Sequence, residues 1–294
     1  MKRNTALITL IIAGLGPPQL ILGQQSIGDP KSVFGTFVSL PGLGRVQAIN
    51  NAGQIAGQTG GGDNVQGFLL NNPQDPKLST TEVAVPRSKQ TLVYGMDNST
   101  RIVGGYDKPD HSGSHGFLLV NGQTTTIDFP GGTDTKARSI NDLTQIVGDY
   151  NDSAGNRHGF LYNNGTFTPI DVAGAVNTYV YGINRSGTII GYFADRQGHQ
   201  HGFLSDNTGR IRTIDVPFPG ATDTFLYGIN SLGIIVGSYI DTAGTHGFVD
   251  ISGTFVSVDA PGTPPGIGTF ARSINDSGQI AIYGTMAFLT ALIS

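Results

Sequence analysis

The strongest constraint on the fold of this chain is a unit of about 45 residues that recurs six times. Each copy holds a small residue, an aliphatic residue and Asn or Asp, followed after a short gap by Gly and an Ile-Val-Gly-like segment. The Asn or Asp stands at positions 50, 97, 141, 184, 230 and 275, at spacings of 47, 44, 43, 46 and 45 residues. Such periodicity indicates a repeat architecture, and six units leave no room for a second domain.

Each unit contains four short segments that have the composition of β-strands. They are rich in Ile, Val, Tyr, Phe and Thr, and Gly, Asn, Asp or Pro bounds them. In the fourth unit they are Tyr179–Asn184, Thr188–Phe193, His201–Ser205 and Arg210–Val216. No segment shows the apolar spacing of a helix. The sequence therefore predicts an all-β fold, a six-bladed β-propeller with four antiparallel strands per blade.

The two ends of the repeat array predict how the ring closes. The last unit stops at Ser294 without a fourth strand. The missing strand is found near the N-terminus, where 34–42 matches 166–174 and 254–262. We expect this N-terminal strand to complete the last blade and leave no long free edge.

The turn after the repeated Asn accounts for part of the 44 Gly residues. In Asn184-Arg185-Ser186-Gly187 the Asn side chain caps a tight turn and Gly takes a positive φ without steric cost. Thr100 and Thr144 replace this Gly in the second and third units. Because β-branched residues resist a positive φ, we expect a different turn there.

The first residues have the pattern of an export signal. Two basic residues precede an apolar run at 6–15, and a Pro-Pro pair ends this run before the roughly 20 residues of a membrane span. We therefore expect residues 1–23 to be a signal peptide and residues 24–294 to be the mature propeller. The mature protein is predicted to be secreted or periplasmic and to have no membrane span.

Composition excludes several classes of function. The chain has no Cys, which rules out disulfides, thiolate zinc sites and cysteine nucleophiles. Its net charge of −4 argues against nucleic acid as the main partner. We expect no cofactor and no metal site, and we expect the protein to be a monomer.

The repeated triplet resembles that of a known family. Units two to five carry His-Gly-Phe, at His115-Gly116-Phe117, His158-Gly159-Phe160, His201-Gly202-Phe203 and His246-Gly247-Phe248. Together with the Ile-Asn and Ile-Val-Gly segments, the triplet resembles the probable extracellular repeat family called HAF, although Gly replaces Ala. The resemblance implies an exported bacterial protein of β-propeller type. It implies no activity and no catalytic residues.

An Asp shortly precedes three of the triplet histidines, in the pairs Asp152 and His158, Asp195 and His201, and Asp241 and His246. Such a pair is compatible with a general base or with half of a metal site. It is also compatible with a repeated turn in which Asp caps the backbone. We favour the turn, because an active site is usually single whereas these pairs recur around the ring.

The candidate binding site stands three residues before each repeated Asn, on the predicted innermost strand. These residues are Gln47, Tyr94, Arg138, Tyr181, Tyr227 and Arg272. The two Arg belong to units three and six, on opposite sides of the ring. If the side chains reach the channel, they form a site for a carboxylate or an acidic sugar. The alternative is that they pack between blades.

The sequence favours an exported binding or interaction module whose partner is a glycan or an extracellular protein. One alternative is a carbohydrate-active enzyme, a lyase or hydrolase, with its site in the propeller funnel. Another is a purely structural surface repeat protein. No hydrolase elbow, zinc-protease motif or phosphate loop is present.

Overall fold

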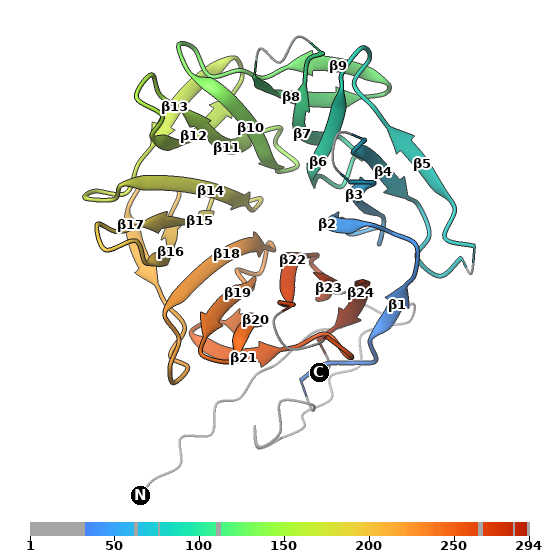
Figure 1. The fold of residues 1–294 in the computed structure, drawn as a ribbon, viewed down its shortest axis with the longest axis vertical. Coiled ribbons are helices and arrows are strands. Elements are labelled where there is room, and N and C mark those ends of the chain that lie inside the picture. Colours follow the sequence, from blue (N-terminus) through green and yellow to red (C-terminus); the bar gives the residue numbers. More distant parts are fainter. Residues whose placement is uncertain are drawn as a thin grey trace, which may run out of the picture.

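The computed structural model describes residues 33–61, 64–75, 77–109, 113–263, 267–284 and 286–292. Within these ranges the chain forms 24 β-strands and no helix. The strands make six sheets of four, set as blades around a ring (Figure 1). The predicted all-β, six-bladed propeller is thus confirmed. The predicted signal peptide at 1–23 lies outside the described residues.

The blades follow one another along the chain, and each first strand lies nearest the centre of the ring (Figure 1). Blades 1 to 3 comprise β2 (Arg45–Ile49), β3 (Ile55–Thr59), β4 (Gln66–Leu70) and β5 (Thr80–Val83); β6 (Gln90–Met96), β7 (Ile102–Asp107), β8 (Ser114–Val120) and β9 (Gln123–Thr126); and β10 (Thr133–Ile140), β11 (Ile146–Asn151), β12 (Arg157–Asn163) and β13 (Thr166–Ile170). Blades 4 to 6 comprise β14 (Asn177–Ile183), β15 (Ile189–Ala194), β16 (Gln200–Ser205) and β17 (Ile211–Ile214); β18 (Asp223–Ile229), β19 (Ile235–Asp241), β20 (Gly244–Ile251) and β21 (Thr254–Val258); and β22 (Phe270–Ile274), β23 (Gln279–Tyr283), β24 (Ala287–Ala291) and β1 (Val38–Leu40).

The N-terminal strand closes the ring as predicted. β1 pairs antiparallel with β24, with Val38 opposite Leu289. Phe34 adds an isolated bridge to Leu292. Figure 1 shows β1 in blue beside β24 in red. The last blade therefore joins both ends of the array, which leaves no blade incomplete.

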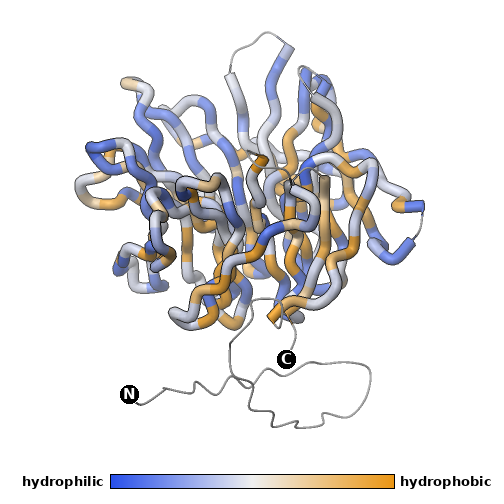
Figure 2. Tube along the Cα trace, turned by 60° about the horizontal axis from the view of Figure 1, so that its bottom comes forward, coloured by the Kyte–Doolittle hydropathy of each residue, from blue (hydrophilic) through white to orange (hydrophobic). Residues whose placement is uncertain are grey.

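The core consists of apolar side chains packed between neighbouring strands and blades. The triplet Phe is almost fully buried in blades 1 to 5, where Phe160 is 0% exposed. The Gly of the second strand makes room for it, because a Cβ on Gly148 would lie 2.9 Å from the Phe160 ring and 1.9 Å from the Lys136 carbonyl oxygen. Figure 2 shows hydrophobic stretches within the blades and hydrophilic colour in many loops.

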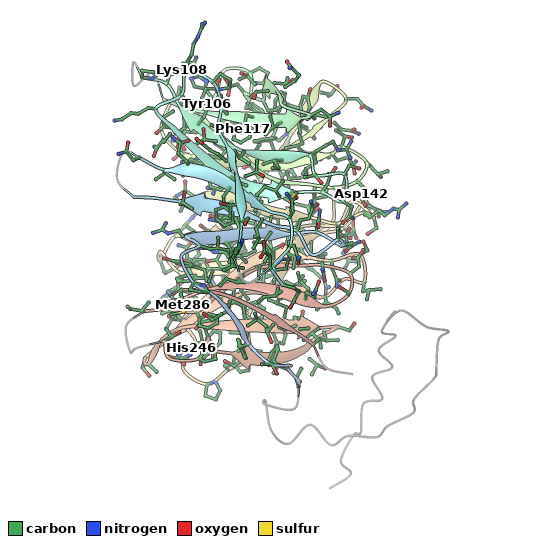
Figure 3. The ribbon with its side chains drawn as sticks, turned by 90° about the vertical axis from the view of Figure 1, so that its right-hand side faces the viewer. Tyr106, Lys108, Phe117, Asp142, His246 and Met286 are labelled. Carbon is green, nitrogen blue, oxygen red and sulfur yellow. The ribbon has the colours of Figure 1, made fainter. Side chains whose placement is uncertain are left out.

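The ring has two faces that differ in which connections they carry. Asp142, in the turn between the first and second strands of blade 3, lies at one face in Figure 3, which we call the turn face. Lys108 and His246 lie toward the opposite face, which we call the loop face. Because strands alternate in direction, the loops between second and third strands all reach the loop face.

A belt of hydrogen bonds joins the blades at the turn face. Asn141 Oδ1 accepts the backbone N–H groups of Leu143 and Gln145 at 3.0 and 3.1 Å, as a turn cap. Its Nδ2 donates to the carbonyl of Asn184, the equivalent residue of the next blade, at 3.0 Å. The same donation to the next blade is made by Asn50, Asn184, Asn230 and Asn275. The belt is circular, since Asn275 donates to Asn50.

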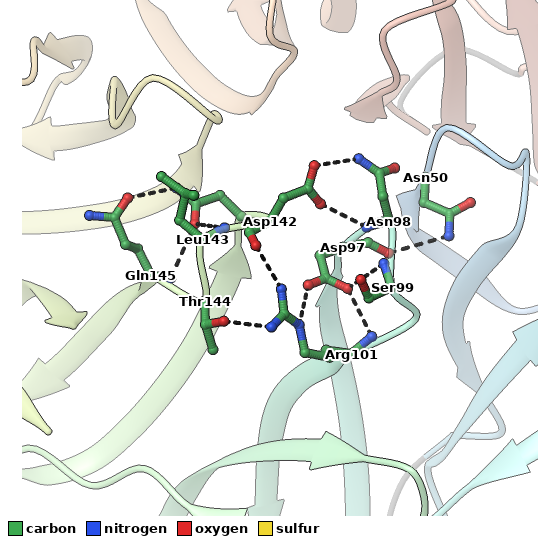
Figure 4. Close-up of polar contacts among 10 residues, drawn as sticks. Asn50, Asp97, Asn98, Ser99, Arg101, Asp142, Leu143, Thr144 and Gln145 are labelled. Atoms are coloured by element: carbon green, nitrogen blue, oxygen red, sulfur yellow. Dashed lines mark hydrogen bonds and ion pairs between the residues drawn. The ribbon is translucent and has the colours of Figure 1, made fainter. Parts of the chain in front are cut away.

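Blade 2 has Asp97 in place of the repeated Asn, and a carboxylate has no proton to donate. Arg101 supplies the missing donor (Figure 4). Its Nε pairs with the Asp97 carboxylate, while its Nη2 donates to the Asp142 carbonyl of blade 3 at 3.0 Å. The belt is therefore closed in all six blades.

Thr100 and Thr144 correct one sequence prediction. Both adopt the left-handed conformation, with φ of 60° and 64°, so the same turn forms and the expected change of turn is wrong. The reason is that each side chain is held by a neighbouring blade. Thr100 Oγ1 donates to Gln54 Oε1 at 3.0 Å, and Thr144 Oγ1 accepts from Arg101 Nη1 at 2.5 Å.

We expect Asn141→Asp to lower the free energy of unfolding by about 1–3 kcal/mol, because it keeps the turn acceptor but removes the donor to Asn184. Adding Gln145→Arg recreates the Asp97–Arg101 arrangement and should restore part of the loss. Urea unfolding of the two variants measures both effects.

Asn207→Asp is the matched control for the belt variant, because Asn207 is exposed at a turn. It should change the free energy of unfolding by no more than about 0.5 kcal/mol. An Asn141→Asp variant as stable as the wild type would show that the belt does not stabilise the ring.

Candidate functional site

The six residues predicted to form a site share one backbone feature. Each stands at a register shift of its inner strand, as Arg138 does between Ala137 and Ser139. The corresponding shifts enclose Gln47, Tyr94, Tyr181, Tyr227 and Arg272. A bulged residue is left out of the ladder, and its side chain is re-aimed. The bulge is thus the local reason that these polar side chains turn toward the centre.

All six residues line a single cavity of about 340 Å³ at the centre of the ring. The turns of the belt form its mouth on the turn face. Each of the six side chains is partly buried. The structure thus brings the predicted residues together around the channel.

Five of the six residues touch one another in a continuous arc. The Arg138 guanidinium lies 4.5 Å from the centre of the Tyr94 ring and 4.7 Å from that of Tyr181. Tyr181 is 5.3 Å from Tyr227, centre to centre, and the Arg272 guanidinium lies 4.3 Å from the Tyr227 ring. Cation–π contacts of this kind fix the guanidinium groups in place.

Arg138 belongs to an ion-pair network inside blade 3. Its Nε donates to Asp149 Oδ2 at 2.6 Å, and Arg157 Nη1 donates to the other oxygen of Asp149 at 2.7 Å. Burial alone would lower the pKa of Arg138, but Asp149 and the neighbouring tyrosines raise it well above its usual value. Arg138 therefore stays charged, and part of its charge is balanced within the protein.

Arg272 is balanced by no such partner. Among the residues that the structure describes, it forms no hydrogen bond or ion pair, and its contacts are the Tyr227 ring and the Phe270 ring at 5.0 Å. Its guanidinium therefore carries five N–H donors and a positive charge that the surrounding protein leaves unused. An anion in the cavity would supply the missing acceptor.

Two tyrosines of the cavity, Tyr94 and Tyr227, are neutral at ordinary pH. Burial raises the pKa of Tyr94 to about 12 and also raises the pKa of Tyr227. Tyr227 Oη accepts a hydrogen bond from Ser238 Oγ at 3.2 Å. Neutral phenols beside the guanidinium groups can donate to, or accept from, the hydroxyl and carboxylate groups of a ligand.

Sequence reasoning missed the second layer of the site. The second-strand Gly recurs in the first five blades and is Ala281 in the sixth, whereas the residue after it varies: Gln58, Gly105, Asp149, Tyr192, Ser238 and Ile282. Asp149 pairs with Arg138, and the Tyr192 ring lies 5.4 Å from that of Tyr181. Variation at a fixed place in the repeat was the pattern that could have identified these residues.

The repeated histidines do not line the cavity. His246 lies toward the loop face in Figure 3, and the other three stand near the start of the equivalent third strands, which begin at that face. His158 Nε2 lies 3.3 Å from Asp152 as expected, but its Nδ1 also lies 2.8 Å from Asp171, which the sequence did not indicate. The ring packs 5.5 Å from Tyr150. His201 and His246 repeat this bridge between two aspartates. The arrangement favours the structural interpretation.

These bridges predict how stability depends on pH. Burial lowers the pKa of His158, His201 and His246, but the hydrogen bonds and charges of the aspartates outweigh it, so each pKa is raised. The folded state then binds the proton more tightly than the unfolded chain. The stability that each protonated histidine contributes is complete below about pH 6.5, the pKa of a histidine in the unfolded chain. This contribution is lost as pH rises through the raised pKa of the folded state.

We therefore expect wild-type stability to fall as pH rises above about 6.5, and to fall less in a His158→Gln, His201→Gln, His246→Gln variant. Urea unfolding of both proteins between pH 6 and 8.5 measures the difference. Equal pH dependence in the two proteins would show that the bridges are not linked to folding.

No protein-family model and no curated protein sequence matches this chain. Several solved structures have a similar fold. A gluconolactonase from Xanthomonas campestris has a TM-score of 0.54 and 10% identity, covering 90% of this chain and 92% of its own. A triple mutant of AofleA from Arthrobotrys oligospora has a TM-score of 0.53 and 13% identity, with 88% and 86% covered.

TolB from Acinetobacter baumannii has a TM-score of 0.53 and 12% identity over 88% of this chain, but the chain spans only 55% of the length of TolB. At such identities the similarity shows the propeller fold alone. The resemblance to HAF repeats therefore stays a prediction. Among the residues that the structure describes, no helical segment has the length and hydropathy of a membrane span.

Proposed function

We propose that this protein is an exported binding module that takes the acidic sugar of a glycan into its central cavity. The observation that carries the proposal is Arg272, a partly buried guanidinium without an acid partner among the described residues. Leaving a charge uncompensated in a confined site costs free energy, and an incoming carboxylate would recover it.

The rest of the cavity is suited to a ligand that bears hydroxyl groups. Gln47 and three tyrosines present amide and phenol groups beside the two guanidiniums. A volume of about 340 Å³ accommodates one or two sugar rings. The N-terminal export pattern and the resemblance to HAF repeats support a setting in which such glycans are met.

Binding is better supported than catalysis. The carboxylates in the cavity lining, those of Asp97, Asp142 and Asp276, all accept hydrogen bonds from the belt or its neighbours. The repeated histidines stand near the loop-face start of the third strands and are absent from the cavity lining. A general acid or base needs a proton-transfer group within reach of the ligand, and the described lining contains no histidine. Burial raises the pKa of Tyr94 and Tyr227, which makes both phenols less suited to proton transfer near neutral pH.

We expect the protein to bind uronate-bearing glycans on an array, and Arg272→Ala to weaken this binding about tenfold or more through loss of a charge-assisted hydrogen bond. Arg138→Ala should weaken it as well, while Asp149 keeps its bond to Arg157. Isothermal titration with a uronate and thermal unfolding of each variant separate binding from folding.

Arg196→Ala is the matched control, because Arg196 is exposed in a loop of the loop face. It should leave glycan binding unchanged. Undiminished binding by folded Arg272→Ala would place the ligand elsewhere, and no binding of any glycan by the wild type would favour a structural role.

A further inference from the structure

The cavity is deeper on one side of the ring than on the other. In blades 1 and 2 its lining includes Arg45 and Leu92, which stand two residues before Gln47 and Tyr94. In blades 3 to 6 the inner-strand lining begins at the bulged residue. At about 3.3 Å per strand residue, the deep side extends about 7 Å beyond the level of the bulges.

Arg45 lies at this end of the lining, where its side chain is exposed, and it has no acid partner among the described residues. Its guanidinium carbon lies 5.7 Å from the centre of the Tyr283 ring. Its guanidinium donors are therefore open to a ligand. Arg45 and Arg272 thus form two cationic points at two depths of one cavity, both without a protein carboxylate to balance them.

The mouth has the opposite balance of charge. Its rim positions carry Asp142, Asp276 and Arg185, which sum to a net negative charge. Both aspartates are held in place by the belt: Asp142 accepts from Asn98 Nδ2 at 2.9 Å, and Asp276 accepts from the Ser231 N–H at 2.8 Å. The field therefore favours a ligand whose negative groups lie inside and whose outer part is neutral.

We propose that Arg45 forms a second anion subsite, so that the cavity takes a glycan end with two consecutive acidic sugars, inserted with its acidic end inward. This inference rests on the proposed function. One carboxylate pairs with Arg272 at the level of the bulges, and the second reaches Arg45 on the deep side. A third acidic sugar would meet the carboxylates of the rim and gain nothing.

Titration with mono-, di- and tri-uronates of galacturonic, glucuronic and mannuronic acid tests the subsite. For the wild type, the dimer of the preferred sugar should bind about tenfold more tightly than the monomer, and the trimer no more tightly than the dimer. Arg45→Gln should reduce dimer affinity to that of the monomer, and Arg45→Lys should restore part of the gain. Arg272→Ala should weaken both ligands.

The results separate the two proposals. If the monomer binds through Arg272 but Arg45→Gln leaves the dimer-to-monomer ratio unchanged, the subsite is overturned and the proposed function stands. If the trimer binds about tenfold more tightly than the dimer, the proposed orientation, in which the acidic end of the glycan enters the cavity first, is overturned. If no uronate binds the wild type, the proposed function and the subsite both fall.

Discussion

The circular belt of asparagine side chains is the interaction on which the rest of the structure depends. Each Asn side chain makes two kinds of hydrogen bond. Its oxygen accepts from backbone N–H groups in the turn of its own blade, and its nitrogen donates to a backbone carbonyl of the next blade. Because Asn275 donates to Asn50, the belt joins the last blade to the first at the same level as all the others. β1 closes the ring a second time, at its outer edge. The exception at Asp97 follows the same logic, since Arg101 restores the donor that a carboxylate lacks.

The belt also sets where a site can form. It holds the six inner strands at one height, so the bulge that precedes each Asn faces the same cavity in every blade. The scaffold residues are therefore fixed while the bulged residue and the one after the second-strand Gly are free to differ. In this chain those positions produce a cation balanced by Asp149 at Arg138 and, at Arg272, a cation with no carboxylate partner among the described residues. The repeat supplies the geometry, and departures from it supply the chemistry.

Whether the sequence alone predicts an interaction depends on how far apart its partners lie along the chain. The strands and the Asn-Gly turns are encoded locally, and the structure bears them out. The closing strand was identified from its match to equivalent strands of other units, and it pairs with β24 as expected. The cap at Asn184 was foreseen because the backbone N–H groups that donate to its Oδ1 lie two and four residues ahead, whereas its bond to Asn230 depends on how blades meet. Thr144 was misjudged for the same reason, because Arg101 of another blade holds it. The six bulged residues were identified from their place in the repeat, but the Asp149 partner of Arg138 needed the register of two strands.

In the proposed site the belt and the bulges present Arg272 to a ligand as a cation without a carboxylate partner among the described residues. A crystal structure of the mature protein, soaked with a uronate that it binds, tests this arrangement. We expect a carboxylate within hydrogen-bond distance of the Arg272 guanidinium, in the cavity that opens on the turn face. A sugar bound between blades or on the loop face, or an Arg272 turned away to pair with a protein carboxylate, would contradict it.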